Sequence, residues 1–309
     1  MKRLIQFHAL PNIGNARQSY TSVREWISEN RYNTISEMDG GLFLEAYSFD
    51  ELVSAISYDF QRFACSSYES MELSRMERAS SPATSWPLLK SYYSGFFGAH
   101  AILNSVGLGE LYLNAALVQN MVDFAALTKV PVPKIVSGSF TYKVVDAGPK
   151  TGLLILQGAG GQGVHDGFWR RLCNHLSDLL DAYVDHGGPN PGEILGEVDK
   201  IQTMVRDTSR RGVWLSNTRN EINYQHLYDC WLPNTRASKC RDLSFEPIYE
   251  SSEALGKLDS VTGDLERFLL VSRCFSSLCS EIVEYYVNSH GGNSPVARRW
   301  SRLKLLLAA

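Results

Sequence analysis

The chain has 309 residues, 44% of them hydrophobic and 20% charged, which is enough to bury one large core. Its formal net charge of −3 excludes a global positive field that would draw it onto nucleic acid, so any RNA contact must use a local patch. The six cysteines have no CxxC pair or regular spacing, which fits reduced thiols in a cytoplasm. With no signal peptide and no run of the ~20 apolar residues that a bilayer span requires, we expect a cytoplasmic protein without membrane association.

Residues 1–80 are predicted to form an N-terminal helical region. Helical patterns cover residues 22–29 and 51–68, and the second follows a capping Asp50. A stretch rich in Ser and Ala at 79–85 then predicts a boundary near residue 80.

Residues 81–290 are predicted to form the main helical domain. Over 86–106 apolar residues recur at three- and four-residue steps, and Gly107 follows as a stop, so this is the strongest helix of the sequence. The helical pattern continues over 111–127. A β-hairpin is then predicted within 135–160, where two short β-rich runs flank a turn.

Helical patterns return after the hairpin. They cover 168–183, 193–205, 208–214 and 264–286, and residues 291–309 are left as a C-terminal tail. The predicted fold class is therefore mainly α.

The stretch RNEINYQH at 219–226 carries the strongest chemical signal, in a helical segment that Pro233 must end. Two helical turns take about 7.2 residues, so Arg219 and His226 share one face if the helix persists. An arginine and an imidazole can together cleave RNA without a metal: the ribose 2′-OH attacks, the imidazole moves the proton, and the guanidinium stabilises the phosphoryl oxygens. The spacing alone is weak evidence, because Arg170 and His175 also have a suitable spacing.

Two further features give this stretch its context. Polar Asn220 directly follows Arg219, whereas Arg171 follows the rival Arg170. The aromatic stretch KSYYSGFFGAHAIL at 90–103 precedes it in the chain. Together they resemble the HEPN superfamily, whose helical bundles carry Arg, four to six residues and His, and an early helix with paired Tyr and Phe. Asn223 and Tyr224 resemble the Asn-Tyr that often follows the Arg of that family. The resemblance covers residues 86 to 288 and depends on these motifs.

The resemblance implies a HEPN-like helical bundle with an inserted β-hairpin, and a metal-independent endoribonuclease of the kind found in toxin–antitoxin and anti-phage defence systems. It implies no cofactor and no metal. Two protomers would join their motifs in one cleft, and an antitoxin or another defence-system protein would restrain the activity. Arg219 would stabilise transition-state charge, His226 would transfer the proton, Asn220 would orient the phosphate, and Tyr224 would support the site by packing.

Two alternatives remain open. The chain could be a non-catalytic HEPN-like subunit that binds or regulates within a defence complex. It could also be a nucleotide-binding enzyme, because Gly158–Gly163 matches GxGxxG, follows a strand-like run and precedes a helix, with Asp185 at a suitable distance. Against this, 182–184 is a poor second strand. His165, Asp166 and His175 lack any HxH or HExxH frame, so we expect no metal site there.

Overall fold

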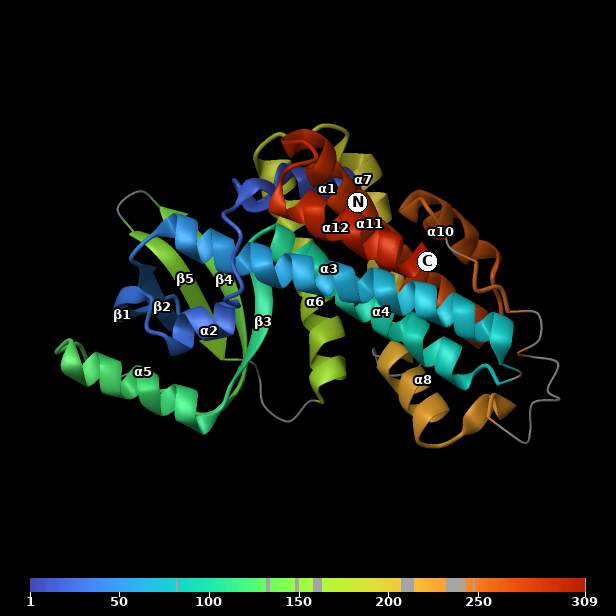
Figure 1. The fold of residues 1–309 in the computed structure, drawn as a ribbon, viewed down its shortest axis with the longest axis horizontal. Helices are drawn as coiled ribbons and strands as arrows, with labels where there is room; N and C mark the ends of the chain where they lie inside the picture. The colour runs from blue at the N-terminus through green and yellow to red at the C-terminus, as the bar shows by residue number, and fades with distance from the viewer. Residues whose placement is uncertain are drawn as a thin grey trace.

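The computed structural model describes residues 1–81, 83–131, 134–147, 150–157, 163–206, 214–231, 240, 243–246 and 248–308. Figure 1 shows a group of helices beside a β-sheet, with the long helix α3 running from the sheet across the helices. The helices are α1 (Lys2–Phe7), α2 (Val23–Ser28), α3 (Phe49–Ser80), α4 (Ser85–Ser105), α5 (Ala115–Leu127), α6 (Val164–Asp185), α7 (Pro191–Arg206), α8 (Trp214–Asn223), α10 (Ser251–Lys257), α11 (Asp264–His290) and α12 (Pro295–Ala308). The strands are β1 (Tyr32–Met38), β2 (Gly41–Ala46), β3 (Leu108–Leu113), β4 (Gly138–Ala147) and β5 (Lys150–Gln157).

Helices α3, α4 and α11 form the centre of the protein, and small residues let them approach closely. A Cβ added to Gly95 of α4 would lie 2.7 Å from the Cα atom of Ser272 on α11, so only glycine fits there. The hydroxyl of Ser94 donates to the backbone oxygen of Ser67 on α3 at 2.8 Å and reaches the hydroxyl of Ser276 on α11, also at 2.8 Å. These bonds satisfy buried hydroxyls where the three helices meet.

The five strands form one antiparallel sheet in the order β1-β2-β5-β4-β3. The hairpin β4–β5 lies inside this sheet, because β2 pairs with the free edge of β5, residues 42–45 against 152–155. The first 80 residues therefore complete a sheet whose other strands come from beyond residue 107. One continuous hydrophobic cluster joins the sheet and the helices into a single core.

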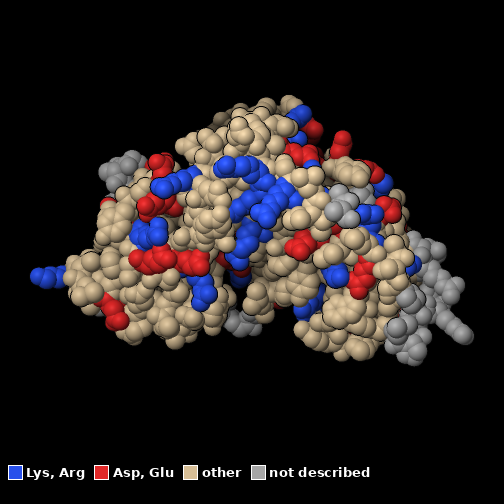
Figure 2. Space-filling model, viewed as in Figure 1, with Lys and Arg blue, Asp and Glu red and all other residues tan. Residues whose placement is uncertain are grey.

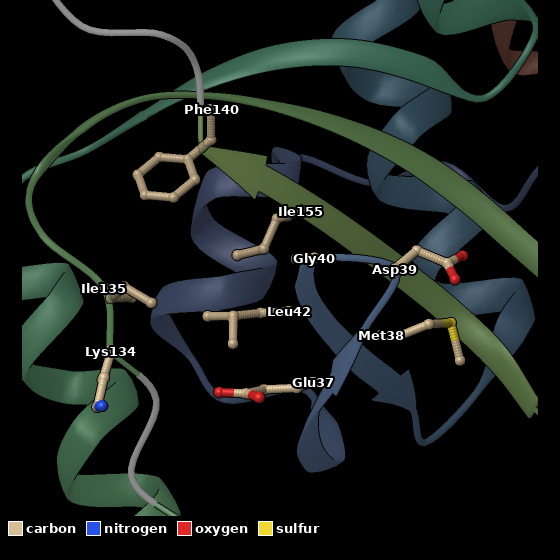
Figure 3. Close-up of a pocket in the computed structure, with 10 residues that line it drawn as sticks. Glu37, Met38, Asp39, Gly40, Leu42, Lys134, Ile135, Phe140 and Ile155 are labelled. Carbon is tan, nitrogen blue, oxygen red and sulfur yellow. The ribbon is translucent and has the colours of Figure 1, made fainter.

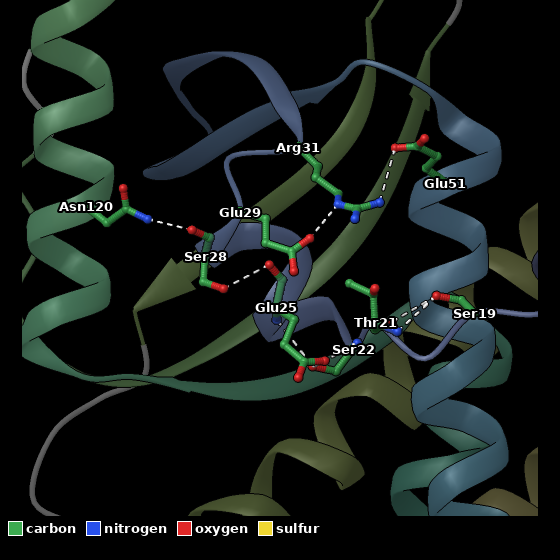
Figure 4. Close-up of polar contacts among 9 residues, drawn as sticks. All are labelled: Ser19, Thr21, Ser22, Glu25, Ser28, Glu29, Arg31, Glu51 and Asn120. Atoms are coloured by element: carbon green, nitrogen blue, oxygen red, sulfur yellow. Dashed lines mark hydrogen bonds and ion pairs between the residues drawn. The ribbon is translucent and has the colours of Figure 1, made fainter.

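A polar network connects α2 to its neighbours (Figure 4). Ser22 and Glu25 form a reciprocal capping box at the start of α2. At its end, the side-chain amide of Asn120 on α5 donates to the backbone oxygen of Ser28 at 2.6 Å. Arg31 then bridges Glu29, at 2.6 Å, to Glu51 on α3, at 3.8 Å. These contacts fix α2 between α3 and α5.

The structure confirms a mainly helical protein with a hairpin near residue 150, and it corrects several predictions. The N-terminal region is not wholly helical, since it contains β1 and β2. The helix predicted over 111–127 begins only at Ala115, because residues 108–113 form β3 and their backbone pairs with β4. Residues 291–309 are not a simple tail: α12 buries Val296, Ala297 and Trp300. No helix in the described part of the chain is both long and apolar enough to span a membrane.

Candidate functional site

Helix α8 ends at Asn223, three residues before His226. The indole nitrogen of Trp231 donates to the backbone oxygen of Ile222 at 2.6 Å, so this carbonyl is bonded to a side chain at the point where the helix stops. His226, Tyr228 and Asp229 then all have positive φ angles, of 53°, 69° and 52°. A left-handed conformation at three of four positions turns the chain out of the helix. Because the helix stops, Arg219 and His226 do not lie two turns apart on one helical face, and that prediction was wrong.

His226 is exposed, and its ring stacks on Trp231 with centroids 5.1 Å apart and an interplanar angle of 24°. The turn that carries it is attached to the start of α4, where the backbone N–H groups of Thr84 and Ser85 lie 3.2 and 3.3 Å from the oxygen of Cys230. Arg219 has no contact with His226 among the described interactions. Within one protomer the predicted catalytic pair is therefore not assembled.

The other three predicted residues do come together around the guanidinium of Arg219. Its Nη1 donates to Asn220 Oδ1 at 2.8 Å and to Tyr224 Oη at 3.3 Å. Its Nη2 donates to Tyr93 Oη on α4 at 2.6 Å. The guanidinium carbon lies 5.7 Å from the centre of the Tyr93 ring and 5.2 Å from that of Tyr224. Arg219 is thus held between Tyr93 on α4 and Tyr224, the residue that follows the end of α8.

The partners of Arg219 are all neutral. No described carboxylate forms an ion pair with it, and its Nε has no hydrogen-bond partner. Burial alone would lower the pKa of Arg219, but the hydrogen bonds to Tyr93 and Tyr224 outweigh it and raise that pKa above its ordinary value. The site therefore holds a half-buried, fixed positive charge that no protein anion in the described structure compensates.

An imidazole that the sequence did not assign to the site lies beside this cluster. His165, in the first turn of α6, has its ring centre 5.8 Å from that of Tyr93, and its Nδ1 is 3.1 Å from Tyr92 Oη. The indole N–H of Trp169 donates to the same Tyr92 oxygen at 3.0 Å, which leaves the Tyr92 hydroxyl proton free to bond His165 Nδ1. In that arrangement the imidazole carries its proton on Nε2.

Burial and, to a smaller extent, the positive charge of Arg219 lower the pKa of His165 to about 4. The ring is therefore neutral at pH 7 and adds no second cation beside Arg219. The groups of this cluster that could bind an anion are the guanidinium of Arg219, the phenol groups of Tyr93 and Tyr224, and the neutral imidazole of His165. Oxyanions such as phosphate are the ligands that this set of donors fits.

Sequence reasoning missed Tyr93 and His165 as members of the site. Tyr92 and Tyr93 were noted only as part of an aromatic helix, and His165 only as a rejected metal ligand. One feature of the sequence does point to His165, which lies two residues after the last glycine of the Gly158–Gly163 stretch. The rival Arg170 pairs instead with Asp166 at 3.6 Å, and burial lowers the pKa of His175.

The predicted nucleotide-binding motif does not have the required context. Residues 158–162 of the Gly158–Gly163 stretch lie outside the described residues. The strand before it, β5, pairs antiparallel with both β2 and β4, whereas a dinucleotide fingerprint follows the first strand of a parallel βαβ unit. This correction removes the fold-level argument for that alternative.

Two other kinds of site, a metal centre and a cavity beside the sheet, can be compared with the Arg219 cluster in the described part of the chain. Within the described ranges no three His, Cys, Asp or Glu side chains are grouped so that they could hold a metal ion. A cavity of about 370 Å³ lies at the β1–β2 turn (Figure 3). Glu37, Asp39 and Lys134 line it together with apolar side chains of Leu42 and Phe140, so it offers no concentrated charge of one sign.

Comparisons with family models, with curated proteins and with solved structures find no match for this chain.

Proposed function

We propose that this protein is a metal-independent endoribonuclease of the HEPN type that works as a homodimer, as an effector of a toxin–antitoxin or anti-phage system. The observation that carries the proposal is the Arg219 cluster, in which a fixed guanidinium has only neutral partners. Phosphodiester oxygens are anions that a guanidinium binds well, and one N–H of Nη2 has no partner among the described residues. Because Tyr93 and Tyr224 already hold the side chain, little rotamer entropy is lost when phosphate binds.

The neighbouring groups would assist Arg219. The phenol oxygens of Tyr93 and Tyr224 accept from the guanidinium, so their own O–H protons remain free to donate to phosphoryl oxygens. His165 Nε2 has no partner among the described residues and supplies a further neutral donor. Donors that are already in place stabilise the charge that develops on the phosphoryl oxygens during attack. Asn220 fixes Nη1 from one side.

His226 would transfer the proton, and the partner protomer would bring it to the phosphate. The end of α8 separates His226 from Arg219 within one chain, and an exposed turn is accessible to a second copy. His226 would take the proton of the 2′-OH as O2′ bonds to phosphorus, and would give it to O5′ as the P–O5′ bond breaks. The products are a 2′,3′-cyclic phosphate and a 5′-OH, and no water or metal is consumed.

Subunit mixing tests this arrangement directly. Arg219→Gln and His226→Asn proteins are assayed on total RNA in EDTA, alone and after mixing; Asn is chosen because it tolerates the left-handed backbone at 226. We expect each variant alone to be inactive. The mixture should recover about a quarter of wild-type cleavage, since half of the dimers would carry one intact composite site. The matched control is His186→Asn, an exposed histidine at the end of α6, which should cleave normally.

Other outcomes of the mixing experiment would contradict the proposal. No recovery on mixing, with confirmed heterodimers, would contradict a site shared between protomers, and full activity of His226→Asn would remove the role of that residue. The break after α8 also favours a second candidate, a HEPN-like subunit that binds RNA without cutting it. Wild-type dimers that bind RNA through Arg219 but never cleave it would support this second candidate and contradict the first.

A further inference from the structure

Arginines gather on the face where α12 crosses α3, as the blue area in the middle of Figure 2 shows. The contacts of α12 with α3, of Arg299 with Tyr58, and of Asp59 with both Arg62 and the start of α2 define the arginine patch as Arg24, Arg62, Arg298, Arg299 and Arg302. Arg298 and Arg302 are one helical turn apart on α12 and exposed, and Arg299 adjoins them. Arg62 on α3 pairs with Asp59, whose other carboxylate oxygen accepts from the backbone N–H of Val23, next to Arg24 on α2.

The α12 side of the patch has no carboxylate partner among the described residues, whereas on the α2 side the pKa of Glu25 is lowered first by its hydrogen bonds with Ser22 and then by Arg62 and Arg24. Arg62 pairs with Asp59 at 2.8 Å, but no described carboxylate forms an ion pair with the other four arginines. The chain as a whole has more acidic than basic residues, 33 against 30, so partners were available. Like charges held together repel one another and do not stabilise a fold. A local positive field on an acidic protein therefore indicates a surface for a polyanion.

One exposed aromatic ring and one half-buried ring lie against the patch. The guanidinium carbon of Arg299 is 5.4 Å from the ring centre of Tyr20 and 5.0 Å from that of Tyr58. Nη2 of Arg299 also donates to the backbone oxygen of Ser19 at 3.1 Å, which fixes the segment carrying Tyr20 against α12. Tyr20 is 72% exposed, so most of its ring is available to a ligand. Such a ring can stack with a nucleic-acid base.

We propose that the arginine patch and Tyr20 form a second RNA-binding surface, which holds single-stranded RNA by its phosphates and by stacking of a base on Tyr20. RNA is favoured over a membrane or an acidic protein because all five cations are arginines, which bind phosphate bidentately, and because an exposed ring lies among them. Helix α8, which carries Arg219, packs against α4 at the lower end of the bundle in Figure 1, away from α12. The inference rests on the proposed function only in its choice of RNA as ligand.

The test measures binding of a fluorescein-labelled 20-nucleotide oligouridylate by anisotropy, over a range of salt concentrations, with the full chain. Arg298→Gln/Arg302→Gln removes two exposed charges that have no described partner. Because each single-strand phosphate contact contributes about 0.7 to the log–log salt slope, we expect the slope to fall by about 1.4 and the affinity at 0.1 M salt to fall about 25-fold. Tyr20→Ser should weaken binding about 5-fold or more and leave the slope unchanged.

The matched control is Lys129→Gln/Lys143→Gln, which also removes two exposed charges without ion pairs, but elsewhere on the surface. Equal losses for the two double variants would overturn the patch. The proposal would also be overturned if Arg298→Gln/Arg302→Gln lost binding to phosphatidylserine vesicles but kept its RNA binding, since the surface would then be a membrane contact. The two proposals fail separately: Arg219→Gln should abolish cleavage and lower the salt slope by at most about 0.7, whereas the patch variant should lower it by about 1.4 and still cleave when RNA is saturating.

Discussion

Nη2 of Arg219 donates a hydrogen bond to the phenol oxygen of Tyr93 at 2.6 Å, and this bond joins α8 to α4. The two residues are far apart in sequence, and neither is fully buried. The bond holds the only charged group of the Arg219 cluster in place, without an anion that would compete with a substrate.

Removal of this bond should cost stability. Hydrogen bonds to charged groups contribute about 1.5–3 kcal/mol, and partial exposure reduces this, so we expect Tyr93→Phe to lower the free energy of unfolding by about 1 kcal/mol. Tyr224→Phe is the control, because its bond to Arg219 is longer, 3.3 Å, and its side chain is 69% exposed. It should cost less than about 0.5 kcal/mol. Urea denaturation compares the two, and equal losses would contradict a structural role for the Tyr93 bond.

Stability should fall as the pH falls below 6.5. Burial, with smaller contributions from nearby positive groups, lowers the pKa of His100 to about 3, from an ordinary value of about 6.5 in the unfolded chain. Between these values the unfolded state binds the proton and the folded state does not. Neutral His100 therefore makes its full contribution to the free energy of unfolding above pH 6.5. That contribution is lost as the pH falls, by up to about 1.4 kcal/mol per pH unit.

Replacement of His100 isolates this effect. His100 lies against the rings of Phe96 and Phe168, at centroid distances of 4.7 and 3.9 Å, so His100→Phe keeps an aromatic ring in the cluster. Unfolding free energies between pH 7 and 5 should show a shallower decline for His100→Phe than for wild type. His186→Gln, at an exposed position, should leave the slope as it is. An unchanged slope in His100→Phe would mean that other groups cause the decline.

The contact of α4 with α11 should depend on the absence of a side chain at residue 95. The Cβ of Gly95→Ala would lie 2.7 Å from the Cα atom and 2.8 Å from the backbone oxygen of Ser272, and backbone atoms cannot move aside easily. We expect a loss of about 1–3 kcal/mol in thermal or urea unfolding. Gly196→Ala on α7 is the matched control: nothing lies within 4 Å of its Cβ, so the better helix former should gain about 0.5–1 kcal/mol. Equal effects at the two positions would contradict the close approach of α4 and α11.

The sequence could predict elements whose pattern is local. Helices α4 and α11 and the hairpin β4–β5 were predicted close to their observed bounds, because three- and four-residue apolar steps and a turn between β-rich runs are encoded in adjacent residues. Strands β1, β2 and β3 were missed. Each is short. β2 and β3 become strands by pairing with segments farther along the chain, such as residues 42–45 with 152–155, whereas β1 pairs with its neighbour β2 across a turn at Asp39 and Gly40 that was not predicted.

In the candidate site, too, the sequence could predict what depends on neighbouring residues but not what depends on distant ones. Arg219 and Asn220 lie in the last turns of α8 and Tyr224 directly follows that helix, with its N–H still bonded to the backbone oxygen of Asn220, so their proximity follows from the sequence. The helical pattern also predicted that His226 continues this face, but the bond from Trp231 to Ile222 and three left-handed residues end the helix first. The residues that complete the cluster, Tyr93 and His165, reach it through packing of α4, α6 and α8.

By itself, then, the sequence determined the helical class, the hairpin and the identity of the arginine on which the proposed chemistry depends, because these features depend on neighbours in the chain. Only the tertiary structure decided that the hairpin belongs to a five-stranded sheet, that His226 lies apart from Arg219 within a protomer, and that Tyr93 holds the guanidinium. The physical reason is that strand pairing, the end of α8 and the partners of a half-buried cation are fixed by contacts between distant segments, and no local periodicity encodes these contacts.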